Sequence, residues 1–156
     1  MDITNNVLLK EYHRQKGFFI TRKNSRKLAE YLVKKLNIDT PSVSHPVRLL
    51  SGGNIQKVLL GREIENNPHL IITAYPSRGL DIGSSHLVYD LLNEQKEKGV
   101  GILFIGEDLD VLMGLADRIL VICEGKVTGI LNRDAFDKQK IGYLMSGGDV
   151  QGGNHD

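Results

Sequence analysis

The residues best suited to binding a phosphate are Ser51-Gly52-Gly53, which come directly before an amphipathic stretch. Glycines let backbone N–H groups approach a bound group without a Cβ in the way. The start of a helix adds unpaired N–H groups and a partial positive charge, and Ser51 adds a hydroxyl donor. Asn54 and Gln56 could add side-chain amides. The same residues could equally be a plain loop with a serine that caps the helix, so residue types alone leave both interpretations open.

The elements around this serine alternate between helix and strand. From residue 50 onward, apolar residues recur at helical spacing or form short runs typical of buried strands. In chain order the pattern predicts a helix over 53–66, a strand at 70–72, a helix over 82–98 ending at Gly99, a strand at 100–105, a helix over 108–115, strands at 118–123 and 126–131 around a turn at Glu124-Gly125, and a helix from a cap at Asn132 to Leu144. This order predicts an α/β fold with a parallel sheet and a small antiparallel piece at its end.

The first 48 residues are different, because they are polar and helical in pattern. Asn24 or Ser25 could cap a helix that runs to about residue 36. The expected buried face of that helix consists of Leu28, Tyr31, Leu32 and Leu36. The last residues, 146–156, are rich in glycine and poor in apolar side chains, which is typical of a disordered tail. We therefore predict three parts, 1–48, 49–145 and 146–156.

The composition argues against several classes of function. The chain of 156 residues has a net charge of +1, so no overall field favours nucleic acid or an anionic membrane. Its one cysteine, Cys123, excludes an internal disulfide and lies in an apolar run, as a small core residue would. The five histidines lack metal-binding spacing. No segment approaches the ~20 apolar residues of a membrane span, and the opening residues do not form a signal peptide.

The serine and glycines belong to a longer string that resembles a family motif. Leu50-Ser51-Gly52-Gly53-Asn54, continued by Ile55-Gln56-Lys57, resembles the signature of ATP-binding cassette (ABC) ATPases, in the variant of bacterial simple-sugar and nucleoside importers. In family order, 70–77 resembles the Walker B strand and its exit, Arg78-Gly79-Leu80-Asp81 the D-loop, and 105–110 the switch-histidine region. The resemblance extends over residues 1–147. It implies a P-loop NTPase-like fold with a partial parallel sheet and flanking helices.

The resemblance also implies what each part of the chain is. Residues 1–48 would belong to the helical subdomain of an ABC ATPase. Residues 49–145 would form the C-terminal part of its nucleotide-binding core, with the signature, the D-loop and the switch region. A sheet without the Walker A strand has an unpaired edge, which could self-associate.

The sequence departs from the family at the positions that carry out hydrolysis. It has no Walker A string of glycines followed by Lys and Ser or Thr. Ala74 stands where an aspartate would hold Mg²⁺, and Tyr75 stands where a glutamate would activate water. Glu107 replaces the switch histidine, and its negative charge would repel phosphate. We therefore expect no catalytic residue, no metal site and no ATP hydrolysis in this chain alone, although the whole would be an ABC-type ATPase.

The resemblance then implies a role that depends on a second domain. In the family, two nucleotide-binding domains pair head to tail, and the signature of one closes over ATP held by Walker A of the other. The residues implied at that site are Leu50, Ser51, Gly52, Gly53, Asn54 and Gln56 of the signature and Gly79, Leu80 and Asp81 of the D-loop. ATP and Mg²⁺ would bind in the full assembly, which would include the other nucleotide-binding domain, permease subunits and, indirectly, a solute-binding lipoprotein. The chain would lie in the cytoplasm on the inner face of the cell membrane.

Two other functions stay open at this stage. A non-transport ABC protein for DNA repair or for work at the ribosome would also carry a signature. Such proteins usually follow the two glycines with Glu or Gln and carry basic or coiled-coil insertions, so Asn54 counts against them. In the other alternative the signature is vestigial, and the chain is only a docking module.

Overall fold

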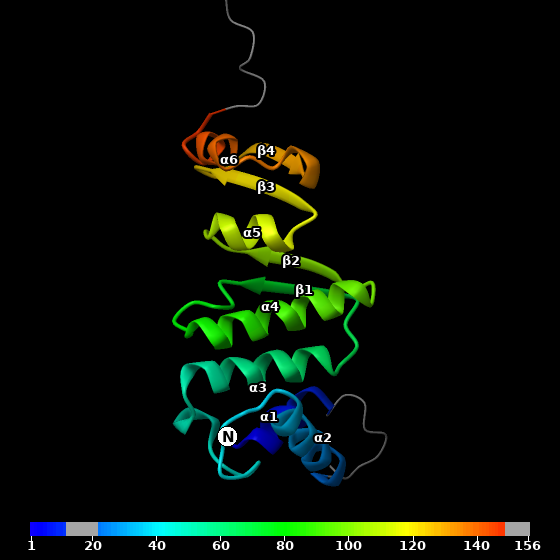
Figure 1. Cartoon of the computed structure of the whole chain (residues 1–156). Coiled ribbons are helices and arrows are strands. Elements are labelled where there is room, and N and C mark those ends of the chain that lie inside the picture. The colour runs from blue at the N-terminus through cyan, green and yellow to red at the C-terminus, as the bar shows by residue number, and fades with distance from the viewer. Residues whose placement is uncertain (12–21, 149–156) are drawn as a thin grey trace, which may run out of the picture. The chain divides into compact units, whose positions relative to one another are not determined.

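The computed structural model describes residues 1–11 and 22–148 of the chain (Figure 1). Contacts divide the chain into two units, Met1–Leu103 and Phe104–Asp156. The first unit contains α1 (Ile3–Glu11), α2 (Arg22–Lys35), the 3₁₀ helix η2 (Val47–Leu49), α3 (Gly52–Ile64), β1 (Leu70–Ala74), α4 (Ile82–Glu97) and the start of β2 (Gly101–Ile105). The second contains α5 (Leu109–Leu115), β3 (Arg118–Cys123), β4 (Lys126–Asn132), the 3₁₀ helix η3 (Arg133–Ala135) and α6 (Lys138–Met145).

Three helices, α1, α2 and α3, pack against one another in the first unit. The buried face of α2 consists of Ser25, Ala29 and Leu32, which recur at helical spacing. The helix begins at Arg22, so Ser25 lies inside it and the predicted cap at Asn24 or Ser25 is wrong. Tyr31 is exposed, although we expected it on the buried face. The small side chains of Ser25 and Ala29 occupy that face instead, which lets a neighbouring helix approach closely.

Helix α3 approaches α2 at a glycine. A Cβ on Gly61 would lie 2.7 Å from Leu36 Cδ1 and 2.9 Å from Leu32 Cδ2. Both leucines are almost fully buried. A larger residue at this position would therefore force the two helices apart.

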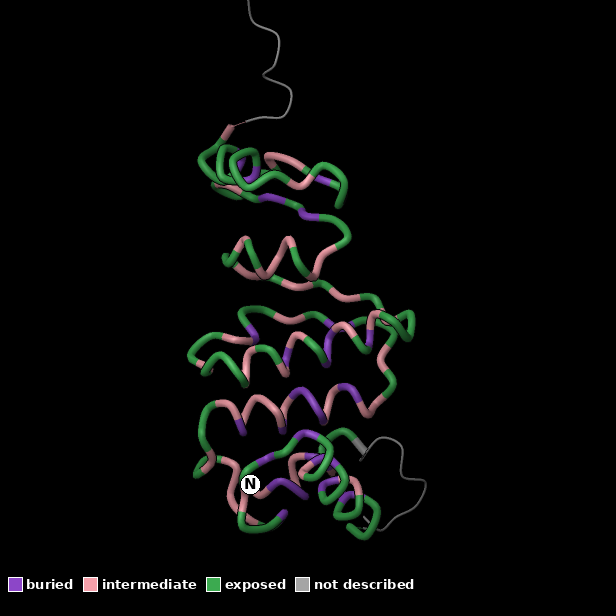
Figure 2. Tube along the Cα trace, viewed as in Figure 1, coloured by how far each residue is buried: buried purple, intermediate pink, exposed green. Residues whose placement is uncertain are grey.

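Helix α4 packs beside α3, and buried positions recur along both helices (Figure 2). On α4 the buried residues are Val88, Leu91, Leu92 and Gln95. Gly99 follows the end of α4 with a φ of +83°, as we predicted for the residue after this helix. The packing of α4 on α3 therefore holds the first turns of both helices, and the loops before them, within the first unit.

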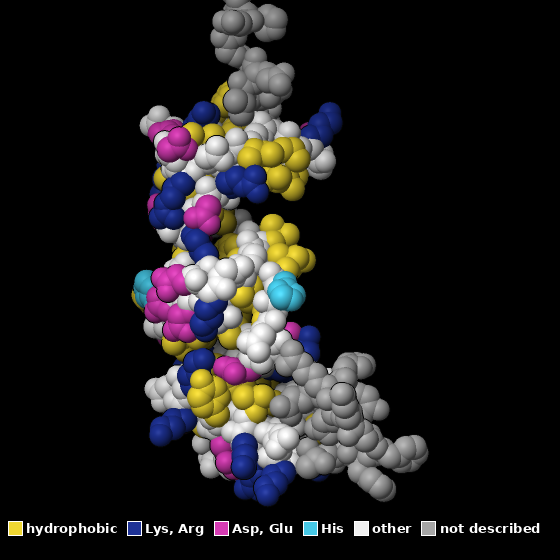
Figure 3. Space-filling model, turned by 90° about the vertical axis from the view of Figure 1, so that its right-hand side faces the viewer, with side chains coloured by type: hydrophobic (Ala, Val, Ile, Leu, Met, Phe, Trp, Pro, Cys, Tyr) yellow, Lys and Arg dark blue, Asp and Glu magenta, His cyan; other side chains and the backbone are white. Residues whose placement is uncertain are grey.

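Strands β1 and β2 form a two-stranded sheet. Ile71 is 7% exposed, whereas Leu70 and Ile72 are 57% and 63% exposed. Because successive side chains of a strand point to opposite faces, one face of β1 is covered and the other is bare. The prediction of a short buried strand is therefore wrong for this second face, because Leu70 and Ile72 are exposed. Hydrophobic side chains reach the surface at several places in the space-filling view (Figure 3).

Strands β3 and β4 form the predicted antiparallel pair in the second unit, with Arg118 opposite Asn132. The turn at Glu124 and Gly125 has φ values of +48° and +77°. Two positive φ values are typical of the hairpin turn that matches the twist of its strands. Helix α6 packs on this pair, and the core consists of Ile119, Val121, Leu131, Ile141 and Leu144.

The helix that we predicted to begin at Asn132 starts later. Asn132 still pairs with β3 as the last residue of β4, and η3 follows it. Asp137 caps α6 instead, because its Oδ1 accepts a hydrogen bond from the backbone N–H of Lys140 at 2.7 Å. Cys123 is half-buried at the end of β3 and lies outside the core cluster.

The predicted three-part division is a functional one, and the two units do not coincide with it. It therefore stays a prediction. The predicted disordered tail falls mostly on residues 149–156, which lie outside the described residues. No helix in the described part of the chain is both long and apolar enough to cross a bilayer.

Candidate functional site

Ser51 caps α3 at the signature. Its Oγ accepts hydrogen bonds from the backbone N–H of Asn54 at 3.4 Å and from Asn54 Nδ2 at 3.0 Å. A serine oxygen has two acceptor lone pairs and one donor proton. Both bonds use the oxygen as an acceptor, and no described residue accepts from Ser51. The exposed hydroxyl therefore keeps its proton for a group outside the loop.

The backbone around Ser51 adds further donors. The first backbone bond back to Ser51 within α3 comes from Ile55, whose N–H donates to Ser51 O at 2.9 Å. The N–H groups of Gly52 and Gly53 lie in the first turn, where a helix offers no partner, and no described residue accepts from them. Leu50 closes η2 through its N–H to Val47 O at 3.1 Å. Gln56 is half-buried in the second turn of α3.

The signature lies against the D-loop in the first unit. A Cβ on Gly53 would lie 2.6 Å from Ser84 Oγ and 3.7 Å from Asp81 Oδ2. A Cβ on Gly52 would lie 4.0 Å from Gly79 O. The structure therefore brings together the two segments that the sequence analysis assigned to one ATP site.

Asp81 of the D-loop caps α4. Its Oδ1 accepts from the backbone N–H of Ser84 at 2.9 Å, and its Oδ2 accepts from Ser84 Oγ at 2.7 Å. These bonds from Ser84 hold the pKa of the Asp81 carboxyl below its ordinary value. Within the loop, Gly79 has a φ of +76° and Leu80 donates its N–H to Ser77 O at 3.1 Å.

The end of β1 is a tight turn without a carboxylate side chain at residues 74 and 75. Ala74 is exposed and has no ligand atom. Tyr75 has a φ of +50°, a left-handed conformation that is costly for a bulky residue. Its carbonyl oxygen accepts from the N–H of Arg78 at 3.1 Å, and Ser77 Oγ accepts from Tyr89 Oη at 2.7 Å. These hydrogen bonds hold the turn, but neither Ala74 nor Tyr75 offers a carboxylate.

Glu107, in the second unit, is exposed just before α5. Its neighbour Asp108 caps α5, because its Oδ1 accepts from the N–H of Asp110 at 3.0 Å and of Val111 at 3.2 Å. The carboxylate of Asp110 pairs with Lys138 Nζ at 2.8 Å. Asp108 therefore stabilises the start of α5.

Two contacts at the site were not found from the sequence. Ser84 bridges the D-loop to Gly53, and its position three residues after Asp81 is the one signal that could have indicated a cap. Asn54 is 9% exposed, and its Oδ1 accepts from the backbone N–H of Asp39 at 3.1 Å. No sequence pattern links residues 39 and 54.

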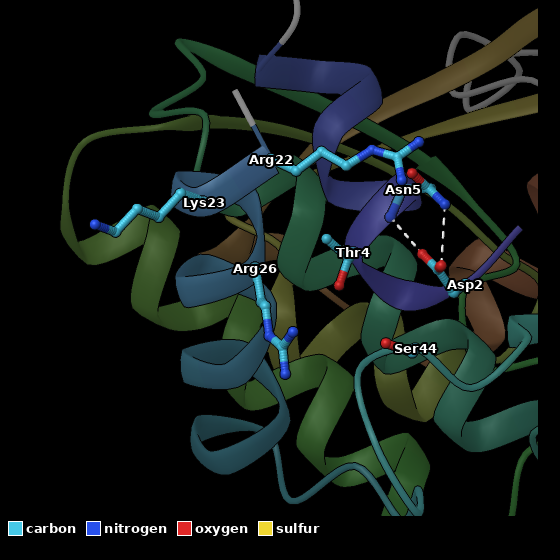
Figure 4. Close-up of a pocket in the computed structure, with 7 residues that line it drawn as sticks. All are labelled: Asp2, Thr4, Asn5, Arg22, Lys23, Arg26 and Ser44. Carbon is cyan, nitrogen blue, oxygen red and sulfur yellow. Dashed lines mark hydrogen bonds between the residues drawn. The ribbon is translucent and has the colours of Figure 1, made fainter. Parts of the chain in front are cut away.

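Other clusters carry no comparable arrangement. The described residues contain no group of three His, Cys, Asp or Glu side chains placed to hold a metal ion. A pocket lies beside α1 and the start of α2, where the Asp2 carboxylate accepts from Asn5 (Figure 4). Its lining consists of Asp2, Thr4, Asn5, Arg22, Lys23, Arg26 and Ser44. None of the predicted site residues lines it.

Three curated proteins are similar to the chain in sequence. It is 38% identical over 148 residues to the xylose import ATP-binding protein XylG of Moorella thermoacetica, covering 95% of this chain and 29% of that protein. It is 40% identical over 139 residues to the ribose import ATP-binding protein RbsA of Clostridium perfringens, covering 89% and 28%. It is 38% identical over 148 residues to the guanosine import ATP-binding protein NupO of Bacillus subtilis, covering 93% and 29%. The chain thus spans less than a third of the length of these relatives.

Solved structures give the same fold. A dimeric ATP-binding cassette in a post-hydrolysis state, bound to ADP and Pi, matches with a TM-score of 0.73 at 25% identity, over 87% of this chain and 58% of that chain. A putative metal-chelate type ABC transporter in an inward-facing conformation matches with a TM-score of 0.78 at 18% identity, over 94% and 58%. The second match bears on the fold alone.

No protein-family model matches the chain. The curated relatives nevertheless match along nearly its whole length, and the solved cassettes share its fold. The resemblance stated from the signature and its downstream segments is thereby confirmed. The chain thus has the fold of an ABC ATPase and is related in sequence to the ATP-binding proteins of sugar and nucleoside importers.

Proposed function

We propose that the chain is the C-terminal part of the second nucleotide-binding domain of a sugar- or nucleoside-type ABC importer. In this proposal its signature and D-loop complete an ATP site whose Walker A loop belongs to another nucleotide-binding domain. The names of the curated relatives, all import ATP-binding proteins, support the transport role. The dimeric state of a similar cassette supports the pairing of two domains.

The observation that carries the proposal is the donor set at Ser51. The outward hydroxyl and the N–H groups of Gly52 and Gly53 lie together at the start of α3, beside the D-loop. Such a set suits the terminal phosphate of ATP, because fixed donors stabilise developing negative charge without reorganising. The same contacts would orient the phosphate for attack by water.

The residues of this chain do not suit Mg²⁺. Ala74 has no ligand atom, and Tyr75 is a poor base at neutral pH. The metal and the attacking water would therefore be held by the domain that carries Walker A. This chain would contribute orientation and charge stabilisation to hydrolysis.

The remaining parts of the assembly follow from the family. Permease subunits would hold the ATP-binding domains at the cytoplasmic face of the cell membrane, and a solute-binding lipoprotein would act on the far side. Since ATPase domains do not contact the transported solute, the choice between a sugar and a nucleoside rests on the relatives alone.

The test is Ser51→Arg in an assembled importer that contains this chain. The bulky side chain removes the hydroxyl and obstructs the signature. We expect a loss of ATPase activity of about a hundredfold or more, in the range seen when a fixed transition-state donor is removed. Tyr75→Phe is the matched control and should leave the activity unchanged, because the proposal gives its hydroxyl no role.

Three results would contradict the proposal. Unchanged ATPase and transport in Ser51→Arg would indicate a vestigial signature and a docking module. Turnover of Mg-ATP by the purified chain, lost in Ser51→Arg, would show that it hydrolyses ATP alone. Recovery of ribosomes or DNA instead of a permease would support the non-transport alternative.

A further inference from the structure

Asn54 makes three hydrogen bonds within the chain. Its side chain is 9% exposed, its Oδ1 accepts from the N–H of Asp39 at 3.1 Å, and its Nδ2 donates to Ser51 Oγ at 3.0 Å. Its backbone N–H also donates to Ser51 Oγ, at 3.4 Å. The Oδ1 and one proton of Nδ2 are thus already engaged within the chain.

The direction of these bonds is fixed by the backbone. The N–H of Asp39 can only donate, so it must face the carbonyl oxygen of the Asn54 amide. The amide NH₂ then faces Ser51, and Ser51 Oγ must accept from it. The Ser51 proton is thus excluded from this bond and directed away from the loop.

We infer that Asn54 is a positioning residue, which holds the Ser51 hydroxyl as a donor toward the nucleotide. This inference rests on the proposed function and deepens it. It assigns Asn54 a role through Ser51, in place of the direct contact with ATP that its place in the signature implied. A side chain in this position must both accept from Asp39 and donate to Ser51, which an amide can do.

The loop that contains Asp39 makes a second contact with α3, which supplies a control. Lys57 Nζ donates to the carbonyl oxygen of Asn37 at 3.0 Å, in an exposed position. Lys57→Met would cut this tether without touching Ser51. If the effect of Asn54 came merely from holding the loop, then Lys57→Met would show part of it.

The decisive variant is Asn54→Asp. A carboxylate of nearly the same shape still accepts from Asp39 but cannot donate, so Ser51 must give its proton to residue 54. In the assembled importer we expect kcat/KM for ATP to fall about 10- to 100-fold, the size of a lost hydrogen bond to a charged group. Lys57→Met should stay within about twofold of the parent, a small change for an exposed contact.

A double-mutant cycle separates this effect from simple charge repulsion. In a Ser51→Ala background no hydroxyl remains to be turned, so Asn54→Asp should cost at least about tenfold less than it does with Ser51 present. Any cost that remains measures repulsion by the new carboxylate. Equal costs in the two backgrounds would overturn the inference, and so would a loss in Lys57→Met as large as that in Asn54→Asp.

The same series distinguishes failure of the inference from failure of the proposed function. If Ser51→Ala leaves the ATPase activity unchanged, the signature does not contribute to hydrolysis and the proposed function fails. If Ser51→Ala lowers the activity but Asn54→Asp does not, only the positioning role fails.

Hydrogen exchange in the 156-residue chain gives a readout without activity. The Asp39 amide should be protected in the parent and in Asn54→Asp, and should exchange faster in Asn54→Ala, which loses the acceptor. An unprotected Asp39 amide in the parent would overturn the contact itself.

Discussion

The signature loop and the end of β1 lie in the same unit. Each is a tight turn, the first after η2 and the second after β1. At the signature, a buried amide, a capping serine and a neighbouring loop hold one hydroxyl in a single orientation. At the end of β1, the turn is equally well tied, but it presents the methyl group of Ala74 and the phenol of Tyr75. The signature turn thus presents hydrogen-bond donors, whereas the turn at the end of β1 offers no carboxylate.

This difference indicates what each place is for. A loop that only connected two elements would not need the close fit of Gly53 against Ser84 or the buried amide of Asn54. At the end of β1, the left-handed φ of Tyr75 belongs to a turn that offers no carboxylate. We therefore expect substitutions at the signature to cost more than substitutions at the end of β1.

The largest effect on stability is expected for Gly53→Val. The new Cβ would lie 2.6 Å from Ser84 Oγ and 3.2 Å from Ser84 Cβ. Ser84 would therefore have to turn away from Asp81, or the starts of α3 and α4 would have to separate. We expect the free energy of unfolding in urea to fall by about 1–3 kcal/mol, as for other overpacked sites.

Gly52→Val is the matched control, since the nearest atom to its Cβ would be Gly79 O at 4.0 Å. It should cost no more than about 0.5 kcal/mol. Equal losses in the two variants would mean that the signature does not fit closely against the D-loop.

A smaller effect concerns the charge of Asp81. Ser84 holds its pKa below the ordinary value in the folded chain. A depressed carboxyl pKa contributes stability above its unfolded value, near 4, and that contribution is lost as the pH falls through the folded pKa. Ser84→Ala should move the pKa of Asp81 back toward its ordinary value, as measured by NMR titration of the carboxyl carbon.

If Asp81 titrates identically in the parent and in Ser84→Ala, the cap of α4 does not depend on the Ser84 side chain.

The smallest effect is expected at the end of β1. Asn tolerates the left-handed conformation better than Tyr, so Tyr75→Asn should raise the free energy of unfolding by about 0.5 kcal/mol. Thermal or urea unfolding would measure the gain. Tyr75→Phe keeps the strain and should show none, and destabilisation by Tyr75→Asn would mean that the phenol ring packs usefully at this turn.

Local rules in the sequence predicted the order of the helices from residue 50 onward and the hairpin, and they offered the Ser51 cap as one of two interpretations. A serine before an amphipathic run, or a Glu-Gly pair between two apolar runs, is decided within a few residues, so the sequence contains the full signal. The same holds for the end of α4 at Gly99.

The features that sequence reasoning missed depend on distant partners. The inward orientation of Asn54 depends on the backbone of Asp39, and the buried face of α2 depends on helices that pack against it. The α6 start depends on Asn132 staying paired with Arg118. Burial of β1 was overestimated because an apolar run predicts a strand, but does not show whether both of its faces are covered.

The bare face of β1 has a thermodynamic consequence for this chain. Leu70 and Ile72 are already in contact with water in the folded state, so they expose little further surface on unfolding. Two quantities scale with the area newly exposed on unfolding: the heat capacity change, and the slope of the free energy of unfolding with denaturant concentration. Per residue, both quantities should therefore be lower than in a domain of the same length that covers both faces of its sheet, and the stability of this chain should vary more gently with temperature.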